Sequence, residues 1–227
     1  MELQRMDELM RRLDDLLGRI EALVPPAPRA TDFEDAVAFR WRRLRGAGYL
    51  EGVRELHGIR LRDLQGIDRQ KLELERNTLQ FVNGYPANNA LLWGSRGTGK
   101  SSLVKALVNE YVHRGLRVVE VDKTDLMDLP YILDTLEPRK ERFLLFCDDL
   151  SFEADDASYK ALKAVLDGSV HAPPDNVLLY ATSNRRHLLP EYMKDNLEAR
   201  PVDGEIHQGE AVEEKISLSE RFGLWLS

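Results

Sequence analysis

Eight consecutive residues near the middle of the chain have types and spacing suited to binding a phosphate group. They are Gly94, Ser95, Arg96, Gly97, Thr98, Gly99, Lys100 and Ser101, and they match the pattern G-x-x-x-x-G-K-[ST] at every position. Glycines let several backbone N–H groups point inward toward phosphate oxygens. A helix that begins here adds the positive end of its dipole. The segment, with Ser102 after it, therefore predicts a phosphate-binding loop.

Two side chains of this loop have specific expected roles. Lys100 would reach the β- and γ-phosphates of a nucleotide, and the Ser101 hydroxyl would bind Mg²⁺. The loop is therefore expected to hold a magnesium nucleotide.

A pair of acidic residues, Asp148 and Asp149, follows the apolar segment "FLLFC". A strand would hold both acids at its carboxyl end, where ligands bind in open α/β sheets, so Asp148 is the expected carboxylate of the magnesium site. Asp149 would orient or deprotonate the attacking water, and Glu153 is a weaker candidate for that base. An acid pair after a strand is also a common helix-capping turn, but the phosphate loop upstream favours the functional interpretation.

From residue 61 to the end, apolar segments alternate with amphipathic ones, which predicts strands alternating with helices. The predicted strands are nearly continuous apolar runs, as expected where helices cover both faces of a sheet. The fold class is therefore α/β, with a mainly parallel sheet sandwiched by helices. The expected strands lie in "NNALLWG", "LRVVEVD", "RFLLFCDD" and "NVLLYATSN", and the expected helices in "LRDLQGIDRQKLELERNTLQFVNG", residues 100–114, "TDLMDLPYILDTLE", "DASYKALKAVLDG", "LLPEYMKDN" and "AVEEKISLSERFG".

Two segments precede this core, which spans residues 61–227. Residues 1–24 carry an apolar residue at every third or fourth position, a heptad pattern that predicts an amphipathic helix. Three further leucines, at positions 9, 16 and 23, widen its apolar face, so a coiled coil and a helix docked on its own domain are both open alternatives.

Residues 25–60 are expected to form a proline-rich linker and then a short helix over "FEDAVAFRWRRLRGAGYLEGV". The arginines around Trp41 indicate either a nucleic-acid surface or a solvated face with the tryptophan packed inward, and the second is favoured because the pattern does not repeat.

Bulk composition excludes several classes of protein. The chain has 227 residues, of which 43% are hydrophobic and 31% charged, and its net charge of −7 argues against indiscriminate coating of nucleic acid. Cys147 is the single cysteine, so no internal disulfide forms and a reducing compartment is expected. No segment approaches the ~20 apolar residues of a membrane helix, and the charged N-terminus is not a secretory signal. These features predict a cytoplasmic protein with no membrane partner.

Four segments occur in the order typical of the AAA+ ATPases and together resemble that family: "GSRGTGKSS", "LLFCDDL", "YATSN" and "SLSERFG". They look most like the branch that contains bacterial replication initiators and helicase loaders, where an Asp-Asp pair also ends the second motif strand. More closely, "FRWR", "LQGIDRQK", "NTLQFVNGYPANNALLWGSRGTGKSSLVKAL" and "SLSERFGLWLS" resemble a bacterial AAA+ family known only as domain of unknown function 815, over roughly residues 36–227.

This resemblance implies a P-loop NTPase that binds ATP or ADP with Mg²⁺. It also implies that Asn184 is sensor 1, which hydrogen-bonds the γ-phosphate or the lytic water, and that Arg221 is an arginine finger that reaches into a neighbouring subunit's site. Such a finger can be worth ~10³ or more in rate, so a homo-oligomer is implied as well. Gly66 and Ile67 would lie near the adenine.

Two features depart from the AAA+ pattern. The family usually places a glutamate where this chain has Asp149, which is one methylene shorter, so slow hydrolysis is expected. The sequence stops at Ser227, shortly after Arg221, so the lid subdomain that normally follows is expected to be missing, with lower nucleotide affinity and turnover.

Two functions from different classes are therefore open. The first is an oligomerising, magnesium-dependent ATPase that remodels a protein or nucleic-acid complex, and Asn184 and Arg221 favour it. The second is a nucleotide-gated binding or scaffold module with little or no hydrolysis, and Asp149 and the missing lid favour it. The acidic segment 198–214 is expected to be either a partner surface or a solvated insertion.

Overall fold

The computed structural model divides the chain into two compact units, Met1–Ala30 and Thr31–Ser227. The residues that it describes are 2–23, 31–33, 36–44, 46–53, 58–153, 156–168, 173–186, 188, 200–202, 205–207, 218 and 221–227.

The first unit contains one long helix, α1 (Glu2–Leu23), which confirms the predicted N-terminal helix. Its apolar residues recur at every third or fourth position and so share one side of the helix. The described members of this set, from Met6 to Leu17, have exposed side chains. The predicted proline-rich linker begins at residues 25–30, outside the described part of the chain.

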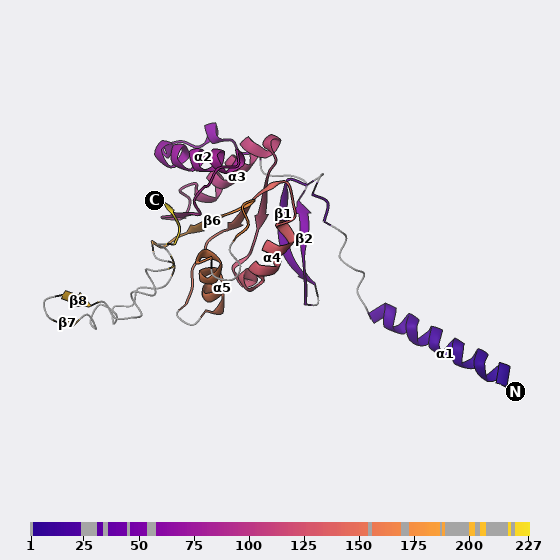
Figure 1. Ribbon diagram of the computed structural model, residues 1–227. Helices are drawn as coiled ribbons and strands as arrows, with labels where there is room; N and C mark the ends of the chain where they lie inside the picture. The colour runs from indigo at the N-terminus through magenta and orange to yellow at the C-terminus, as the bar shows by residue number, and fades with distance from the viewer. Residues whose placement is uncertain are drawn as a thin grey trace. The chain divides into compact units, whose positions relative to one another are not determined.

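The second unit is built on a seven-stranded sheet in the order β2-β1-β4-β5-β6-β3-β9 (Figure 1). The pair β1–β2 is antiparallel, and every other neighbouring pair in this sheet is parallel. The predicted fold class, α/β with a mainly parallel sheet, is confirmed. The strands are β1 (Ala38–Leu44), β2 (Ala47–Val53), β3 (Ala90–Trp93), β4 (Leu116–Glu120), β5 (Arg142–Cys147), β6 (Val177–Ser183) and β9 (Leu224–Leu226).

Helices cover both faces of this sheet, as the continuous apolar strands require. On one face lie α2 (Asp68–Val82) and α3 (Lys100–Tyr111), and on the other α4 (Leu129–Leu136) and α5 (Ala157–Leu166) (Figure 1). Successive residues of β3 point to opposite faces, so Leu91 packs with the α4 and α5 core and Leu92 with the α2 and α3 core. Short 3₁₀ turns span Leu61–Asp63, Val112–Arg114 and Lys123–Asp128, and a separate two-stranded ribbon pairs β7 (Arg200–Val202) with β8 (Glu205–His207).

A buried polar contact fixes α2 against the centre of the sheet. The Tyr180 hydroxyl, on β6, accepts a hydrogen bond from Asn77 Nδ2 at 3.0 Å and shares another with Thr78 Oγ1 at 2.9 Å. Burial raises the pKa of Tyr180 to about 12, so the phenol stays neutral and retains its donor. Because α2 leads into β3, this contact helps to set the position of the loop that follows β3.

The prediction of a short helix within residues 33–53 is wrong. Residues Ala38–Leu44 and Ala47–Val53 form an antiparallel hairpin, and β1 also pairs in parallel with β4. The hairpin therefore belongs to the main sheet, and the compact unit begins at Thr31 instead of residue 61. The physical reason is that buried and less buried side chains alternate along this strand: Phe39 and Trp41 are buried, whereas Arg40 and Arg42, which alternate with them, are on the other face.

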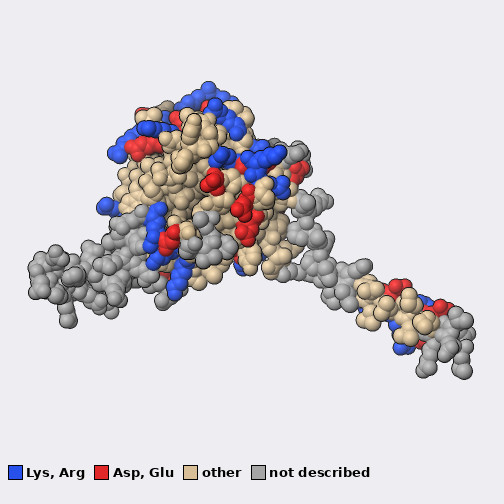
Figure 2. Space-filling model, viewed as in Figure 1, with Lys and Arg blue, Asp and Glu red and all other residues tan. Residues whose placement is uncertain are grey.

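The described arginines of this hairpin are all ion-paired, and Trp41 is packed inward, as the favoured interpretation predicted. Arg40 Nη2 lies 2.7 Å from Glu120 Oε2, Arg42 Nε lies 3.1 Å from Glu51 Oε2, and Arg43 binds both oxygens of Asp128. In the view of Figure 2, basic and acidic side chains also lie interspersed over the second unit. These pairings leave little unbalanced positive charge on the hairpin for a nucleic-acid phosphate.

Two predicted helices fall mostly outside the described residues: only Leu188 of "LLPEYMKDN" is described, and only Leu218 and residues 221–223 of "AVEEKISLSERFG". The acidic segment 198–214 is described only at the backbone of β7 and β8. Among the residues that the structure describes, none of the helices combines the length and apolar character needed to span a membrane.

Candidate functional site

The glycine-rich loop connects the carboxyl end of β3 to the first turn of α3, as the sequence predicts. Three of its glycines have positive φ angles, 138° at Gly94, 79° at Gly97 and 91° at Gly99, a conformation that side chains with a Cβ rarely adopt. Gly99 caps α3, and its carbonyl oxygen accepts a hydrogen bond from the Leu103 N–H at 2.8 Å. The chain therefore leaves the strand, folds back as a concave loop and enters the helix with its backbone N–H groups at the loop.

Lys100 lies across this loop and is held by three oxygen acceptors. Its Nζ donates to the carbonyl oxygens of Gly94 at 2.8 Å and Ser95 at 2.7 Å, and it lies 3.4 Å from Asn184 Oδ1. These are neutral acceptors, so the ammonium charge is solvated by the loop without being neutralised. A phosphate group entering the loop would offer this charge a stronger, ionised partner.

Ser101 and Asp148 meet at the opposite wall, where the second motif strand ends. The Ser101 hydroxyl donates to Asp148 Oδ1 at 2.6 Å, and the Thr182 hydroxyl donates to the same oxygen. Thr182 Oγ1 in turn accepts a hydrogen bond from the Asp149 N–H at 2.8 Å. One hydroxyl from β6 therefore fixes both aspartates, a positioning role that the sequence analysis missed. Its signal was the place of Thr182 near the end of β6, two residues before Asn184.

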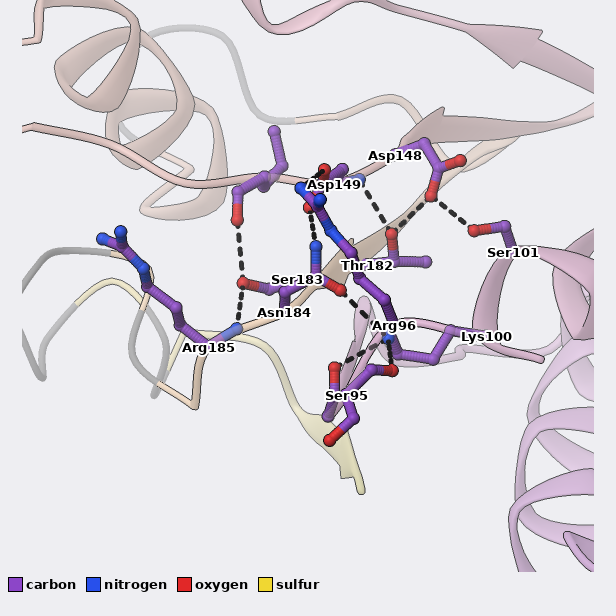
Figure 3. A network of polar contacts seen from close by, with 12 residues as sticks. Ser95, Arg96, Lys100, Ser101, Asp148, Asp149, Thr182, Ser183, Asn184 and Arg185 are labelled. Carbon is purple, nitrogen blue, oxygen red and sulfur yellow. Dashed lines mark hydrogen bonds and ion pairs between the residues drawn. The ribbon is translucent and has the colours of Figure 1, made fainter. Parts of the chain in front are cut away.

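Asp149 has a left-handed backbone conformation, with a φ angle of 52°. Among the described residues, no other non-glycine residue has a positive φ angle. This conformation is uncommon outside glycine and marks positions that the surrounding structure holds in place. Both carboxylate oxygens of Asp149 have partners, since Asn184 Nδ2 donates to Oδ1 and Arg96 Nη2 lies 3.4 Å from Oδ2. Figure 3 shows Asn184 between Asp149 and Lys100, with the Arg96 side chain extending to Asp149.

These residues line a single cleft of about 320 Å³. Most of the residues predicted from the sequence are brought together here, whereas Glu153 and Arg221 are not among the described residues that line it. The lining consists of Arg96, Gly97, Thr98, Gly99, Lys100, Ser101, Ser102, Asp148, Asp149, Thr182 and Asn184.

A second cavity, of about 310 Å³, lies on the other side of the loop and is lined mainly by apolar side chains. It shares Thr98 and Lys100 with the cleft, and Gly94 and Ser95 also face it. Ile67, predicted near the adenine, lines this cavity, whereas Gly66 does not. An apolar cavity that adjoins a polar phosphate cleft suits a flat base attached to a polyphosphate.

Arg221 pairs with Asp167, the residue that caps the end of α5. Its backbone N–H also bonds the Leu218 carbonyl oxygen at 3.2 Å, so it lies in a turn whose neighbours Leu218 and Phe222 are buried in the core. This turn leads directly into β9. The side chain is one-third exposed and is therefore within reach of a second molecule.

The donor set at Ser101 and Asp148 fits a magnesium ion. Mg²⁺ prefers hard oxygen ligands and usually takes only one or two carboxylates, with water and phosphate oxygens completing its shell. A hydroxyl and a carboxylate oxygen 2.6 Å apart supply the protein's share of such a shell. Cys147, immediately before Asp148, is fully buried, and burial raises the pKa of its thiol to about 12, so the thiolate that binds soft metals does not form near neutral pH.

Comparison with known proteins gave one family match and several structural likenesses. The family model described as "Protein of unknown function (DUF815)" matches residues 34–227. The search of curated proteins gave no match. The RuvB Holliday junction branch migration motor of Thermotoga maritima is 19% identical with a TM-score of 0.44, covering 75% of this chain and 48% of that chain. A crystal structure of DnaI is 20% identical with a TM-score of 0.46, covering 77% of this chain and 91% of that chain.

The present chain thus spans about half the length of the RuvB structures. At these scores neither likeness carries an argument about what this chain does.

Proposed function

This chain belongs to the family described as protein of unknown function (DUF815), and we propose that its second unit is an AAA+-type ATPase that binds ATP with Mg²⁺ and hydrolyses it. One observation supports this proposal above the others: the loop lysine, the Ser101–Asp148 pair and the Asp149–Asn184 pair all face one cleft. Each of these groups matches one requirement of phosphoryl transfer to water.

For binding, the loop N–H groups and Lys100 would hold the phosphates, while Ser101 and Asp148 would hold Mg²⁺. When bound, the ion offsets the negative charge of the phosphate oxygens. The apolar cavity beside Ile67 and Trp93 would accept the adenine. Trp93 provides a flat aromatic surface for this, and its ring already has the Arg186 guanidinium 5.7 Å from its centroid.

For hydrolysis, a water oxygen forms a bond to the γ-phosphorus, and the bond between that phosphorus and the β–γ bridging oxygen breaks. The electron pair of the broken bond stays on ADP, and the proton of the attacking water passes to the Asp149 carboxylate and then to solvent. Asn184 positions the base, because its amide bonds Asp149 on one side and faces Lys100 on the other. Asp149 must exchange its contact with Arg96 for the water, and a γ-phosphate near Arg96 would favour that exchange.

Arg221 would act on a neighbouring subunit. It does not line the cleft of its own chain, and it is held on the surface by Asp167 beside the end of α5. An arginine supplied by a second copy would offset charge in the transition state and is worth ~10³ or more in rate. The active form would then be a homo-oligomer. Remodelling of a protein or nucleic-acid complex, and a cytoplasmic location, remain predictions from the sequence.

The test is steady-state phosphate release from Mg-ATP, measured against protein concentration. Activity per chain should rise with concentration, and Arg221→Ala should abolish most of it. Mixing Arg221→Ala with Lys100→Ala should restore activity, because the first variant keeps an intact loop and the second keeps the finger. Arg114→Ala, a change of the same type at another exposed arginine, is the matched control and should behave as the wild type. Activity that is linear in concentration and unaffected by Arg221→Ala would reject the role of Arg221.

A nucleotide-gated scaffold is the second candidate, and one observation favours it. Both oxygens of Asp149 already have a partner, Asn184 at one and Arg96 at the other, so the base must give up or share a contact to bind the attacking water. If this arrangement persists with nucleotide bound, ATP binds without turnover. Tight Mg-ATP binding combined with phosphate release no faster than in the Asp149→Asn variant would establish the scaffold.

A further inference from the structure

The apolar side of α1 is the largest set of exposed apolar side chains among the described residues. Six of them are between 49% and 61% exposed, although they belong to a single helix face. At about 100° per residue they cover about 120° of the helix surface. Water-exposed surface of this kind usually marks an interaction site. The six are Met6, Leu9, Met10, Leu13, Leu16 and Leu17.

Charged residues border this face, and the two edges carry opposite signs. Arg12 and Arg19 follow one edge, next to Leu9 and Leu16, while Asp7 and Asp14 follow the other, next to Met10 and Leu17. Figure 2 shows the tan surface of α1 with charged side chains on its edges. Arg12 also bonds Glu8 on its own helix at 3.1 Å, a largely exposed pair of the kind that contributes little and exchanges readily.

This division of charge selects one way of packing the helix against copies of itself. In a parallel bundle related by rotation, one edge of each helix meets the opposite edge of the next, so arginines would face aspartates. In an antiparallel pair each edge meets its own kind, so arginine would face arginine and aspartate would face aspartate. Like charges in contact are destabilising, and the pattern therefore favours the parallel arrangement.

The width of the face selects the number of helices. A two-stranded seam buries two columns of apolar residues and leaves the flanking columns to charged ones. Whichever two columns of α1 form such a seam, a third remains outside it, either Leu9 with Leu16 or Met10 with Leu17. Three or more helices would bury that third column as well.

We propose that the α1 helices of three or more copies of this chain pack in parallel through this face, with the arginine edge of one helix against the aspartate edge of the next. The occupant of the face is thus a second copy of the same chain. Residues 1–33 lie outside the family match, so that match implies nothing about this contact. It does not depend on the proposed ATPase activity.

The mass of the full chain in solution, measured by light scattering and native mass spectrometry without nucleotide, tests the proposal. The wild type should contain three or more copies, and Leu13→Glu with Leu16→Glu should reduce it to a single copy. The thermal unfolding of the second unit should be unchanged, which separates loss of assembly from loss of fold. A wild type of one or two copies, or a doubly substituted chain that stays assembled, overturns the proposal.

Charge reversal tests the parallel orientation. Arg12→Glu should weaken assembly, whereas Arg11→Glu, the same change on the opposite side of the helix, should not. Reversing Arg12 and Arg19 on that edge, with Arg12→Glu and Arg19→Glu, should dissociate the assembly at low salt, where repulsion from the aspartate edge is least screened. Adding Asp7→Lys and Asp14→Lys to that variant should restore it, because opposite charges then meet again. The parallel bundle is contradicted if the two arginine substitutions leave assembly unchanged. It is also contradicted if the variant with all four substitutions does not assemble.

Discussion

Two aspartates in the second unit differ in the groups that bind their carboxylates. Asp128, at the start of α4, is buried, and its carboxylate is bound by the Arg43 guanidinium through two hydrogen bonds and by Trp41 Nε1 at 2.8 Å. Asp148, at the end of β5, is bound only by the hydroxyls of Ser101 and Thr182 among the described residues. The first carboxylate has its own cation, whereas the second is arranged for one that the chain does not supply.

The difference separates a structural carboxylate from a functional one. The hydrogen bond from Arg43 holds the pKa of Asp128 below its ordinary value, with the Trp41 contact acting in the same direction against the opposing effect of burial. The result ties the β1–β2 hairpin to α4. At the cleft, the ammonium of Lys100 is bound by neutral oxygens, and Asn184 lies between it and the Asp149 carboxylate. A magnesium polyphosphate bound here would give the Lys100 ammonium an anionic partner and the Asp148 carboxylate a cationic one.

The largest effect that we expect comes from Asp149→Asn. The amide cannot accept a proton from water, so phosphate release should fall by about 10²–10⁴. Mg-ATP affinity should change only a few-fold, because Lys100, Ser101 and Asp148 are untouched. Rapid-quench turnover and equilibrium binding on the same preparations check this. Equal loss of affinity and rate would show that Asp149 acts in binding instead.

Asp128→Asn should affect stability and leave the cleft alone. Replacing one partner of a buried, charge-assisted network costs about 2 kcal/mol in the free energy of unfolding. The effect should depend on pH, because the folded pKa of Asp128 is lowered. The stabilisation by the ionised carboxylate is complete above the ordinary value of about 3.9 and is lost as the pH falls through the lower folded pKa.

Denaturant unfolding of wild type and Asp128→Asn at neutral and acid pH measures this difference. The gap in free energy of unfolding should be largest near pH 7 and should close below about pH 4. Nucleotide affinity is the control and should be the same for both proteins. A gap that widens in acid would contradict the assigned role of Asp128.

The smallest effect that we expect comes from Thr182→Val, which tests how the end of β6 positions Asp148 and Asp149. Thr182→Val keeps the shape of the buried side chain but removes the hydroxyl that bonds Asp148 and the Asp149 N–H. The base is then less well placed, and we expect turnover to fall about ten-fold with affinity nearly unchanged. Thr182→Ser should restore most of the turnover. Ser183→Ala, at the next residue of the strand, is the matched control for loss of a buried hydroxyl.

Much of the fold could be predicted because the strands carry a strong local signal. β5 and β6 are almost wholly apolar, and the glycine-rich loop marks where β3 ends and α3 begins. Within the helix predicted over residues 124–137, a 3₁₀ turn gives way to α4 at Leu129, and Pro130 lies in the first turn of α4. In these segments local preference and tertiary packing agree.

The hairpin and the finer geometry of the cleft could not be predicted in the same way. Trp41 and Phe39 alternate with arginines over only a few residues, and that short period-two signal was outweighed by the helix-favouring residues before it. The contact of Asp128 with Arg43 joins positions 85 residues apart. Asp149, with its left-handed conformation, is bound by Thr182 at the end of β6 and by Asn184 just after it. Sequence patterns record neither kind of long-range contact.

Isothermal titration of the full chain with Mg-ATP tests the central claim most directly. The wild type should bind one nucleotide per chain, and Lys100→Ala should bind it about 100-fold more weakly, since the loop loses the ammonium group that is placed to bind the phosphates. Lys105→Ala, one turn further along α3, should bind as the wild type. Wild-type protein that is folded yet binds no Mg-ATP, or that binds it as well without Lys100, would contradict the account.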